Sequence, residues 1–241
     1  MLTNRPLPRP IPFFLVLFLI LPACSLLQTT PAGELVTETH SLERDSAAAV
    51  KVAVIMDEGE LAIQSSPTRL LEGSFAYNLP AWKPEVVYEV SGDQGTLTID
   101  QPQKARGLVR NGQNTWDLRL GEGIPLDIGI MLGAGDSLID LSQLDLTAFS
   151  IDTGSGDLDL DLRGSWARDI PVKLRTGSGD IAIRLPATIG VRVDVSTGSG
   201  DITQTGLQMD GDAYVNAAYG QSPHTLNLTI ETGSGDIHLE G

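Results

Sequence analysis

Cysteine, histidine, aromatic and basic residues are all scarce in this 241-residue chain. It has one cysteine, three histidines and 5% aromatic residues, and its 16 Lys and Arg are outnumbered by 31 Asp and Glu. A single cysteine excludes an internal disulfide framework. The formal net charge of −15 argues against nucleic acid and anionic lipid headgroups as partners, because an acidic surface repels both.

The usual signatures of catalysis and metal binding are missing as well. No serine stands in a Gly-x-Ser-x-Gly motif, and His40, His224 and His238 are far apart and lack metal-ligand spacing. No Gly-rich stretch carries the lysine of a phosphate loop and leads into a helix. We therefore expect no enzyme, no cofactor and no metal site.

The chain does contain one phrase that returns at a nearly fixed step. Thr-Gly-Ser-Gly-Asp occurs at 153–157, 176–180, 197–201 and 232–236, a looser copy lies at 132–136, and a worn copy at 56–60. The steps between the five clear copies are 21, 23, 21 and 35 residues. The glycines predicted to form corners are Gly133, Gly135, Gly154, Gly156, Gly177, Gly179, Gly198, Gly200, Gly233 and Gly235. Such a period is typical of repeat architectures.

Apolar and polar residues alternate on both sides of each corner, as in 170–185. A period of two predicts strands with one buried face. Each unit of about 21 residues then reads strand, corner, strand, with positive φ at both glycines of the corner. The constant step favours an all-β fold in which the units stack as a β-solenoid. The alternative is a β-sandwich in which each corner closes a hairpin.

The N-terminus has the features of a bacterial lipoprotein signal. Residues 1–23 carry Arg5 and Arg9, no acid and an apolar run, and the sequence Leu-Pro-Ala-Cys at 21–24 resembles a lipobox. We expect Cys24 to be acylated and to hold the chain at a membrane, either the cell membrane or an outer membrane, outside the cytoplasm. Cleavage before Cys24 leaves 14 basic and 31 acidic residues, a formal charge of −17.

The remaining chain is predicted to be a tether and one β-repeat domain. Residues 24–46 resemble a tether, and 47–241 form the domain. Its first part, 47–131, starts with a degenerate repeat and holds most of the large aromatic residues, so we interpret it as antiparallel strands that cap the stack, with the aromatics in the core. Residues 132–241 are the regular repeats. The long last step leaves an insertion within 206–223, and we take its Tyr214, Asn216 and Tyr219 as a candidate partner-binding loop.

The aspartates of the repeated phrase share one position, so stacking would place them about 4.8 Å apart. Three roles are open for this row: carboxylates that are solvated or bonded to the amides of their own corner, Ca²⁺ ligands, or a catalytic carboxylate of a polysaccharide-cleaving enzyme. We favour the first. The residues concerned are Asp136, Asp157, Asp180, Asp201 and Asp236.

Several stretches outside the corners point to a known family. With the Gly-Ser-Gly-Asp phrases, the segments 72–75, 82–86, 114–118 and 215–220 resemble the bacterial toast-rack family, which is similar to the C-terminal domain of the cell-envelope stress protein LiaF. The resemblance covers roughly 40–241. It implies a β-repeat domain outside the cytoplasm and, in LiaF relatives, a part in sensing cell-wall-active antibiotics; it carries over no catalytic residue. The chain lacks the several membrane helices that precede the domain in LiaF.

These observations predict a membrane-anchored structural or interaction module for envelope stress sensing or adhesion. Its partner would be an envelope protein or a glycan. The alternative function is a carbohydrate-active β-helix enzyme, which needs carboxylates in a groove with basic or aromatic substrate contacts.

Overall fold

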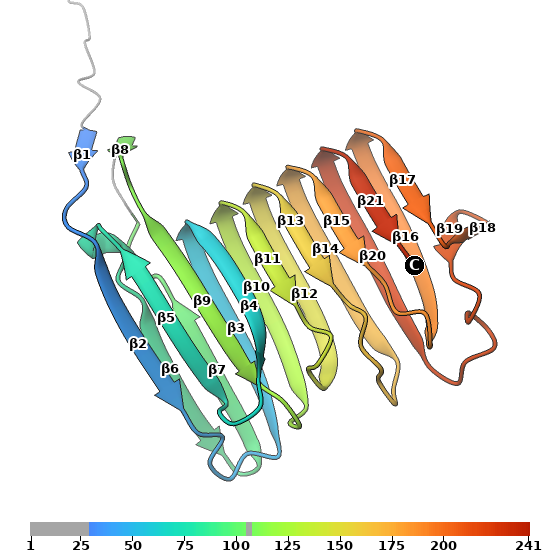
Figure 1. The fold of residues 1–241 in the computed structure, drawn as a ribbon, viewed down its shortest axis with the longest axis horizontal. Helices are drawn as coiled ribbons and strands as arrows, with labels where there is room; N and C mark the ends of the chain where they lie inside the picture. Colours follow the sequence, from blue (N-terminus) through green and yellow to red (C-terminus); the bar gives the residue numbers. More distant parts are fainter. Residues whose placement is uncertain (1–28, 105–107) are drawn as a thin grey trace, which may run out of the picture.

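A computed structural model describes residues 29–104 and 108–241, and most of them belong to two large β-sheets (Figure 1). The strands of the ten-stranded sheet, in spatial order, are β18 (Gln208–Asp210), β19 (Ala213–Val215), β16 (Gly190–Ser199), β20 (Thr225–Ser234), β14 (Ile170–Ser178), β12 (Leu146–Ser155), β10 (Leu126–Ala134), β3 (Ala49–Glu58), β7 (Gln94–Asp100) and β6 (Glu85–Ser91).

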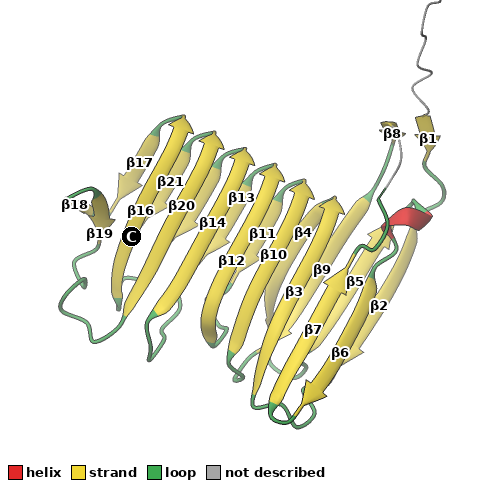
Figure 2. Ribbon diagram, turned by 180° about the vertical axis from the view of Figure 1, so that it is seen from behind, coloured by secondary structure: helices red, strands yellow, loops and turns green. Residues whose placement is uncertain are grey.

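The nine-stranded sheet faces the first one. In spatial order it contains β17 (Ile202–Thr205), β21 (Ile237–Glu240), β15 (Ile181–Arg184), β13 (Leu158–Asp161), β11 (Ser137–Asp140), β4 (Glu60–Ser66), β9 (Asn114–Gly121), β5 (Leu71–Tyr77) and β2 (Val36–Leu42). A small parallel pair, β1 (Thr29–Pro31) and β8 (Leu108–Arg110), lies beyond one end, near the 3-10 turn η1 (Pro80–Trp82). Figure 2 shows both sheets from behind.

Six pairs of strands, which we call units 1 to 6 in sequence order, build most of the molecule. They are β3–β4, β10–β11, β12–β13, β14–β15, β16–β17 and β20–β21. The two strands of a unit belong to different sheets, so the corner between them is not a hairpin and the hairpin-based sandwich is wrong. Neighbouring units pair in parallel. Antiparallel pairing is made by the additional strands at the two ends of the stack.

The units are not stacked in sequence order. Unit 6 lies between units 4 and 5, because β20 pairs with β14 on one side and β16 on the other, and β21 pairs likewise with β15 and β17. An ion pair fits this order, since Arg175 of unit 4 contacts Glu231 of unit 6 at 2.9 Å. The all-β class is confirmed. The sheets are large, mixed and open, so a regular β-solenoid is not confirmed.

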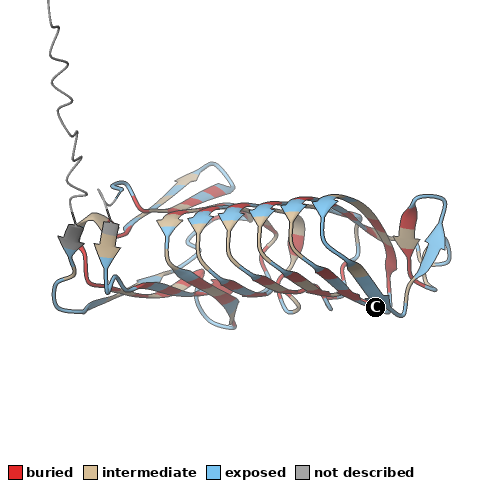
Figure 3. Cartoon of the chain, turned by 90° about the horizontal axis from the view of Figure 1, so that it is seen from above, coloured by how far each residue is buried: buried red, intermediate tan, exposed pale blue. Residues whose placement is uncertain are grey.

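The core between the sheets is built from the alternating residues of the units. Inward positions such as Ile151, Leu174 and Ile230 are almost completely buried, whereas their neighbours on the outer faces are polar (Figure 3). The aromatic residues expected in the core lie there only in part. Phe75 and Trp116 are fully buried in it, with ring centroids 5.4 Å apart in an edge-to-face arrangement, whereas Tyr77 and Trp82 form a separate buried cluster and Tyr88 is partly buried.

The N-terminal end corrects two sequence-based interpretations. Strands β6 and β5 cap this end by antiparallel pairing, as expected for the segment 47–131, and β2, which lies outside that segment, pairs antiparallel with β5. Strands β7 and β9 of the same segment were expected to be antiparallel as well, but they run parallel to unit 1 and extend the stack. Strand β2 lies inside the segment 24–46 that the sequence predicts as a tether. It was missed because it is an edge strand, so its residues are mostly polar and half-exposed.

Candidate functional site at the glycine-aspartate corners

The structure brings the repeated phrases together in one row along an edge of the molecule, seen from above in Figure 3. The worn copy at 56–60 is the corner of unit 1 and begins the row, as the sequence predicts. The five clear copies follow in the order of units 2, 3, 4, 6 and 5. The threonine, both glycines and the aspartate of the phrase each have a structural reason to recur.

The threonine bonds within its own corner, and the first glycine allows the backbones of neighbouring units to lie close together. The threonine hydroxyl donates to the serine carbonyl of its own corner, at 3.2–3.5 Å in all four full copies. The first glycine does not have positive φ, contrary to our prediction. It is needed because a Cβ would overlap a carbonyl oxygen of the adjacent unit: Gly133 for Gly154, and Gly154 for Gly177.

The second glycine meets two constraints at once. Its φ lies between 115° and 134° in all five copies, a region that L-residues rarely adopt. A Cβ there would also overlap the carbonyl oxygen of the equivalent glycine in the next unit, as for Gly179 against Gly156. Backbone hydrogen bonds continue around the corner, for example from the Gly156 N–H to the Ser178 carbonyl at 3.2 Å.

The aspartates of the row are exposed to solvent, in line with one of the two roles joined in our favoured prediction. The other role is wrong, because the carboxylates bond to adjacent units and not to the amides of their own corner. In four of the five, the Oδ1 atom accepts the N–H of the aspartate in the next unit, at 2.8–3.0 Å. The chain of bonds runs through Asp136, Asp157, Asp180, Asp236 and Asp201 in spatial order. In the described part of the molecule, no hydrogen bond or ion pair reaches the carboxylate of Asp201, where the row ends. This arrangement is a structural ladder with exposed charge.

The structure assembles no recognisable reaction centre from the described residues. Among them, no group of three or more His, Cys, Asp and Glu side chains could hold a metal ion. The three histidines lie on different elements: His40 in β2, His238 in β21, and His224 before β20. His238 contacts the Thr203 hydroxyl at 2.9 Å through Nδ1.

The residues of the predicted partner loop have mainly structural contacts. The insertion forms the antiparallel pair β18–β19, which extends the sheet from β16 and caps unit 5. Asn216 is buried; its Nδ2 donates to the carbonyls of Pro186 and Ile189 at 3.0 and 2.8 Å, and its Oδ1 accepts the N–H of Val191 at 3.0 Å. The interpretation of Asn216 as a partner contact is therefore wrong. An Asn that anchors a loop and one that binds a partner look alike in sequence.

The other two residues of that loop are partly exposed. Tyr214 packs against the core from β19, opposite Val193 of β16. Tyr219 contacts the Arg192 guanidinium, whose pKa is raised mainly by its hydrogen bond to Asp194 and then by the one to Tyr219.

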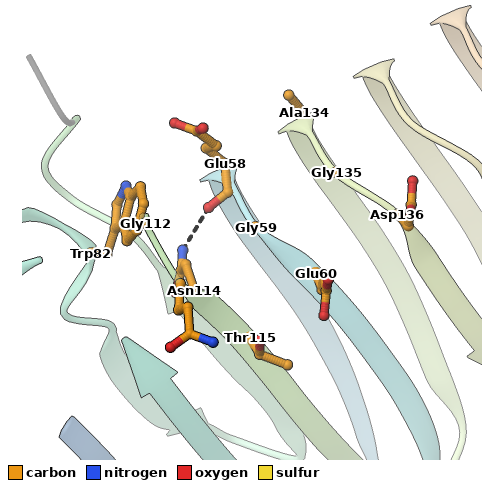
Figure 4. Close-up of a pocket in the computed structure, with 11 residues that line it drawn as sticks. Glu58, Gly59, Glu60, Trp82, Gly112, Asn114, Thr115, Ala134, Gly135 and Asp136 are labelled. Atoms are coloured by element: carbon orange, nitrogen blue, oxygen red, sulfur yellow. Dashed lines mark hydrogen bonds between the residues drawn. The ribbon is translucent and has the colours of Figure 1, made fainter. Parts of the chain in front are cut away.

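A recess of about 340 Å³ lies where the row of corners meets the N-terminal cap (Figure 4). Trp82, Glu58, Glu60 and Asp136 are among the residues that line it. The buried side chain of Asn114 donates to the Glu58 carbonyl at 2.6 Å, which joins β9 to the corner of unit 1. Sequence reasoning missed this residue because it belongs to no repeat.

The predicted lipidation site, Cys24, lies outside the described residues, as does the predicted signal segment 1–23. The part of the chain that the structure describes contains no helix long and apolar enough to cross a membrane.

Comparison with protein families agrees with this geometry. The model for the N-terminal domain of toast-rack proteins matches residues 31–184. The chain belongs to the toast-rack family. A second model, for the C-terminal domain of LiaF of the cell wall-active antibiotics response, matches residues 134–239 of this toast-rack protein. Among curated proteins, none matches the chain.

Solved structures include a relative with an informative likeness. A candidate cell adhesion protein from Clostridium sporogenes is 32% identical, with a TM-score of 0.83 over 86% of this chain and 99% of its own. A candidate adhesin from Bacteroides fragilis aligns over 87% of this chain and 99% of its own, at 12% identity and a TM-score of 0.30. The second likeness is too low to support any argument.

Proposed function

We propose that this toast-rack protein is a lipid-anchored, extracytoplasmic interaction module in adhesion or envelope stress sensing, and that it is not an enzyme. The observation that carries the proposal is the 32% identity to the candidate cell adhesion protein over nearly the whole of that protein. The match of 134–239 to the LiaF C-terminal model supports a role at the cell envelope.

The architecture suits a module that presents a surface at a distance. Two open sheets with one continuous core form an elongated body, with β1 beyond one end and units 6 and 5 at the other (Figure 1). Anchoring through Cys24, which precedes β1 in the sequence, would place the membrane on the β1 side. The end formed by β16–β19 would then be available to partners.

Fractionation of cells that express the wild-type chain or Cys24→Ser tests the anchor. Wild type should sediment with membranes and carry an acylated N-terminal Cys24, whereas Cys24→Ser should appear as a released or unprocessed form. A wild-type mature chain that is soluble and begins after Cys24 would contradict anchoring.

Complementation and an activity assay test the role itself. In cells that lack the chain, wild type should restore adherence or the response to cell-wall-active antibiotics, and Cys24→Ser should restore neither. The purified chain should release no reducing ends from envelope glycans. Glycan cleavage, lost when a corner carboxylate is replaced, would favour the carbohydrate-active enzyme instead.

A further inference from the structure

The end of the stack at unit 5 is incompletely covered. Strand β17 is the edge of the nine-stranded sheet, paired with β21 on one side only. The inward positions of unit 6, Ile237 and Leu239, are buried, but the equivalent Ile202 is half-exposed and Gln204 is exposed. The hairpin β18–β19 pairs only with Arg192 and Val193 of β16. The last unit therefore lacks the neighbour that every inner unit has.

Among the described residues, no strand pairs with the open side of β17, whose backbone groups there lie in the register of the stack. The carbonyls of Asp201 and Thr205 accept N–H groups from unit 6 and the glycine after it, at 2.9 Å each. Because the N–H and C=O groups of a parallel strand alternate between its two sides, those of Ile202 and Gln204 face the open side. The Asp201 carboxylate stands where each preceding aspartate receives an N–H from the next unit.

The formal charges on the part of the chain that follows Arg192, which builds most of this edge, are all negative. After Arg192 the chain has no Lys or Arg and seven acids. Two of these acids are paired, Asp194 with Arg192 and Glu231 with Arg175. The remaining five are Asp201, Asp210, Asp212, Asp236 and Glu240, all exposed and all on units 5 and 6 or the turn of the cap hairpin. Basic side chains would complement this surface.

We propose that β17 binds an extended, basic segment of a partner protein, which adds to the sheet as a further parallel strand. The N–H groups of such a strand meet the free carbonyls of Ile202 and Gln204 and the Asp201 carboxylate, and its Lys or Arg side chains meet the surrounding acids. This inference deepens, and rests on, the proposed role as an interaction module. A second copy of this chain fits the edge less well, because it is itself strongly acidic.

Binding of a synthetic peptide to the full chain tests the proposal. The probe is a capped peptide of alternating Val and Lys, compared with a Val-Glu peptide and with a Val-Lys peptide whose alternate amides are N-methylated. We expect only the unmodified Val-Lys peptide to bind at low salt, with affinity that falls as salt is added. Equal binding of the N-methylated peptide would show attraction by charge alone and overturn the strand-addition model.

Two substitutions at one position separate backbone from side-chain effects. Gln204→Pro removes an N–H on the open side, where the sheet does not use it, and should weaken peptide binding at least about tenfold. Gln204→Ala is the matched control: it also loses the side-chain bond to the Leu207 N–H, but keeps the backbone N–H, and should bind within about twofold of wild type. Asp201→Asn should weaken binding without lowering the melting temperature.

Other outcomes contradict the proposal in distinct ways. The inference would be overturned if Gln204→Pro bound the Val-Lys peptide with wild-type affinity, or if wild type did not bind this peptide at all. Neither result would bear on the proposed function, which the adherence and complementation assays test separately. Should Gln204→Pro fail to fold, the N-methylated peptide decides the question with the wild-type chain. Concentration-dependent oligomers that disappear in Asp201→Asn or Gln204→Pro would assign the edge to a second copy.

Discussion

Replacing Gly179 by alanine should destabilise the fold by far more than an ordinary surface substitution. Gly179 has a φ of 122°, which costs an L-residue about 1–3 kcal/mol. Its new Cβ would overlap the Gly156 carbonyl oxygen, so units 3 and 4 must separate at the corner.

That separation acts on three hydrogen bonds between the units. They run from Gly156 N–H to Ser178 O at 3.2 Å, from Leu158 N–H to Asp180 O at 2.9 Å, and from Asp180 N–H to Asp157 Oδ1 at 2.8 Å. At about 1 kcal/mol each, their loss and the backbone strain together give a destabilisation of about 5 kcal/mol. In a chain of this size the melting temperature should fall by about 10–20 °C.

Two matched variants separate the contributions, with thermal and urea denaturation as the assay. Gly177→Ala creates the overlap with a neighbouring carbonyl, that of Gly154, without positive φ. Gly211→Ala has a positive φ of 62° but no atom near the new Cβ, so it should cost only about 1–2 kcal/mol. If Gly179→Ala melted within a few degrees of Gly211→Ala, close packing of the corners could not be what requires glycine there.

Three further predictions concern polar contacts. Asn216→Ala should cost about 2–4 kcal/mol in urea denaturation, because it leaves one N–H and two carbonyls without their partner; a cost near zero would mean that the loop is not held by this side chain. Asp157→Asn keeps the acceptor for the Asp180 N–H and removes one negative charge from the row, so its stability at low salt should match or exceed that of wild type. Asp157→Ala loses the acceptor and should be less stable than Asp157→Asn. If Ca²⁺ raised the wild-type melting temperature more than Mg²⁺ did, the row would instead be a metal-binding site. The Tyr77 hydroxyl, which donates at 2.7 Å, and then Lys83 lower the pKa of Glu38 below 4.5, so the Glu38 carboxylate stabilises the fold above pH 4.5 and this contribution is lost as the pH falls through the lowered pKa. Burial and then Glu38 raise the pKa of Tyr77 from 10.0 to about 12, so the contribution of the Tyr77 hydroxyl is lost as the pH rises from about 10 to 12. In measurements of stability against pH, Glu38→Gln should therefore reduce the loss of stability in acid, and Tyr77→Phe should reduce the loss in alkali.

Much of the local structure follows from the sequence because neighbouring residues determine it. The alternation in 170–185 predicts two strands around a corner, and the structure has β14 and β15 there. The burial of the large aromatics, such as Phe75 and Trp116, follows from their size and the scarcity of aromatic residues elsewhere. The degenerate first repeat is recognisable in the sequence because Gly59 keeps the corner glycine, and the structure confirms the corner with a positive φ of 147° at Gly59.

The order of the units could not be predicted from repeated phrases. Because the four full phrases offer the same threonine, glycines and aspartate, the phrase does not distinguish one neighbour from another; the ion pair Arg175–Glu231 fits the place of unit 6 beside unit 4, but it is a contact between residues far apart in the sequence. The hydrogen-bond donor of each aspartate could not be predicted for a similar reason. The repeat spacing places both the amides of its own corner and those of the next unit beside the carboxylate, and does not show which of them donates. Asn216 and Asn114 act through contacts that are distant in sequence, which no local pattern indicates.

Site-specific photo-cross-linking in intact cells tests most directly whether the chain works by holding a partner at the end away from β1. The cross-linker would replace Thr205 at the end of β17, with matched positions at the exposed Leu138 on the face of unit 2 and at Leu35 near the opposite end. We expect a defined cross-linked protein at Thr205, which is weaker or absent at the other two positions and is lost when Cys24→Ser releases the chain. Equal cross-linking at all three positions, or none at any of them in cells where the chain is active, would contradict it.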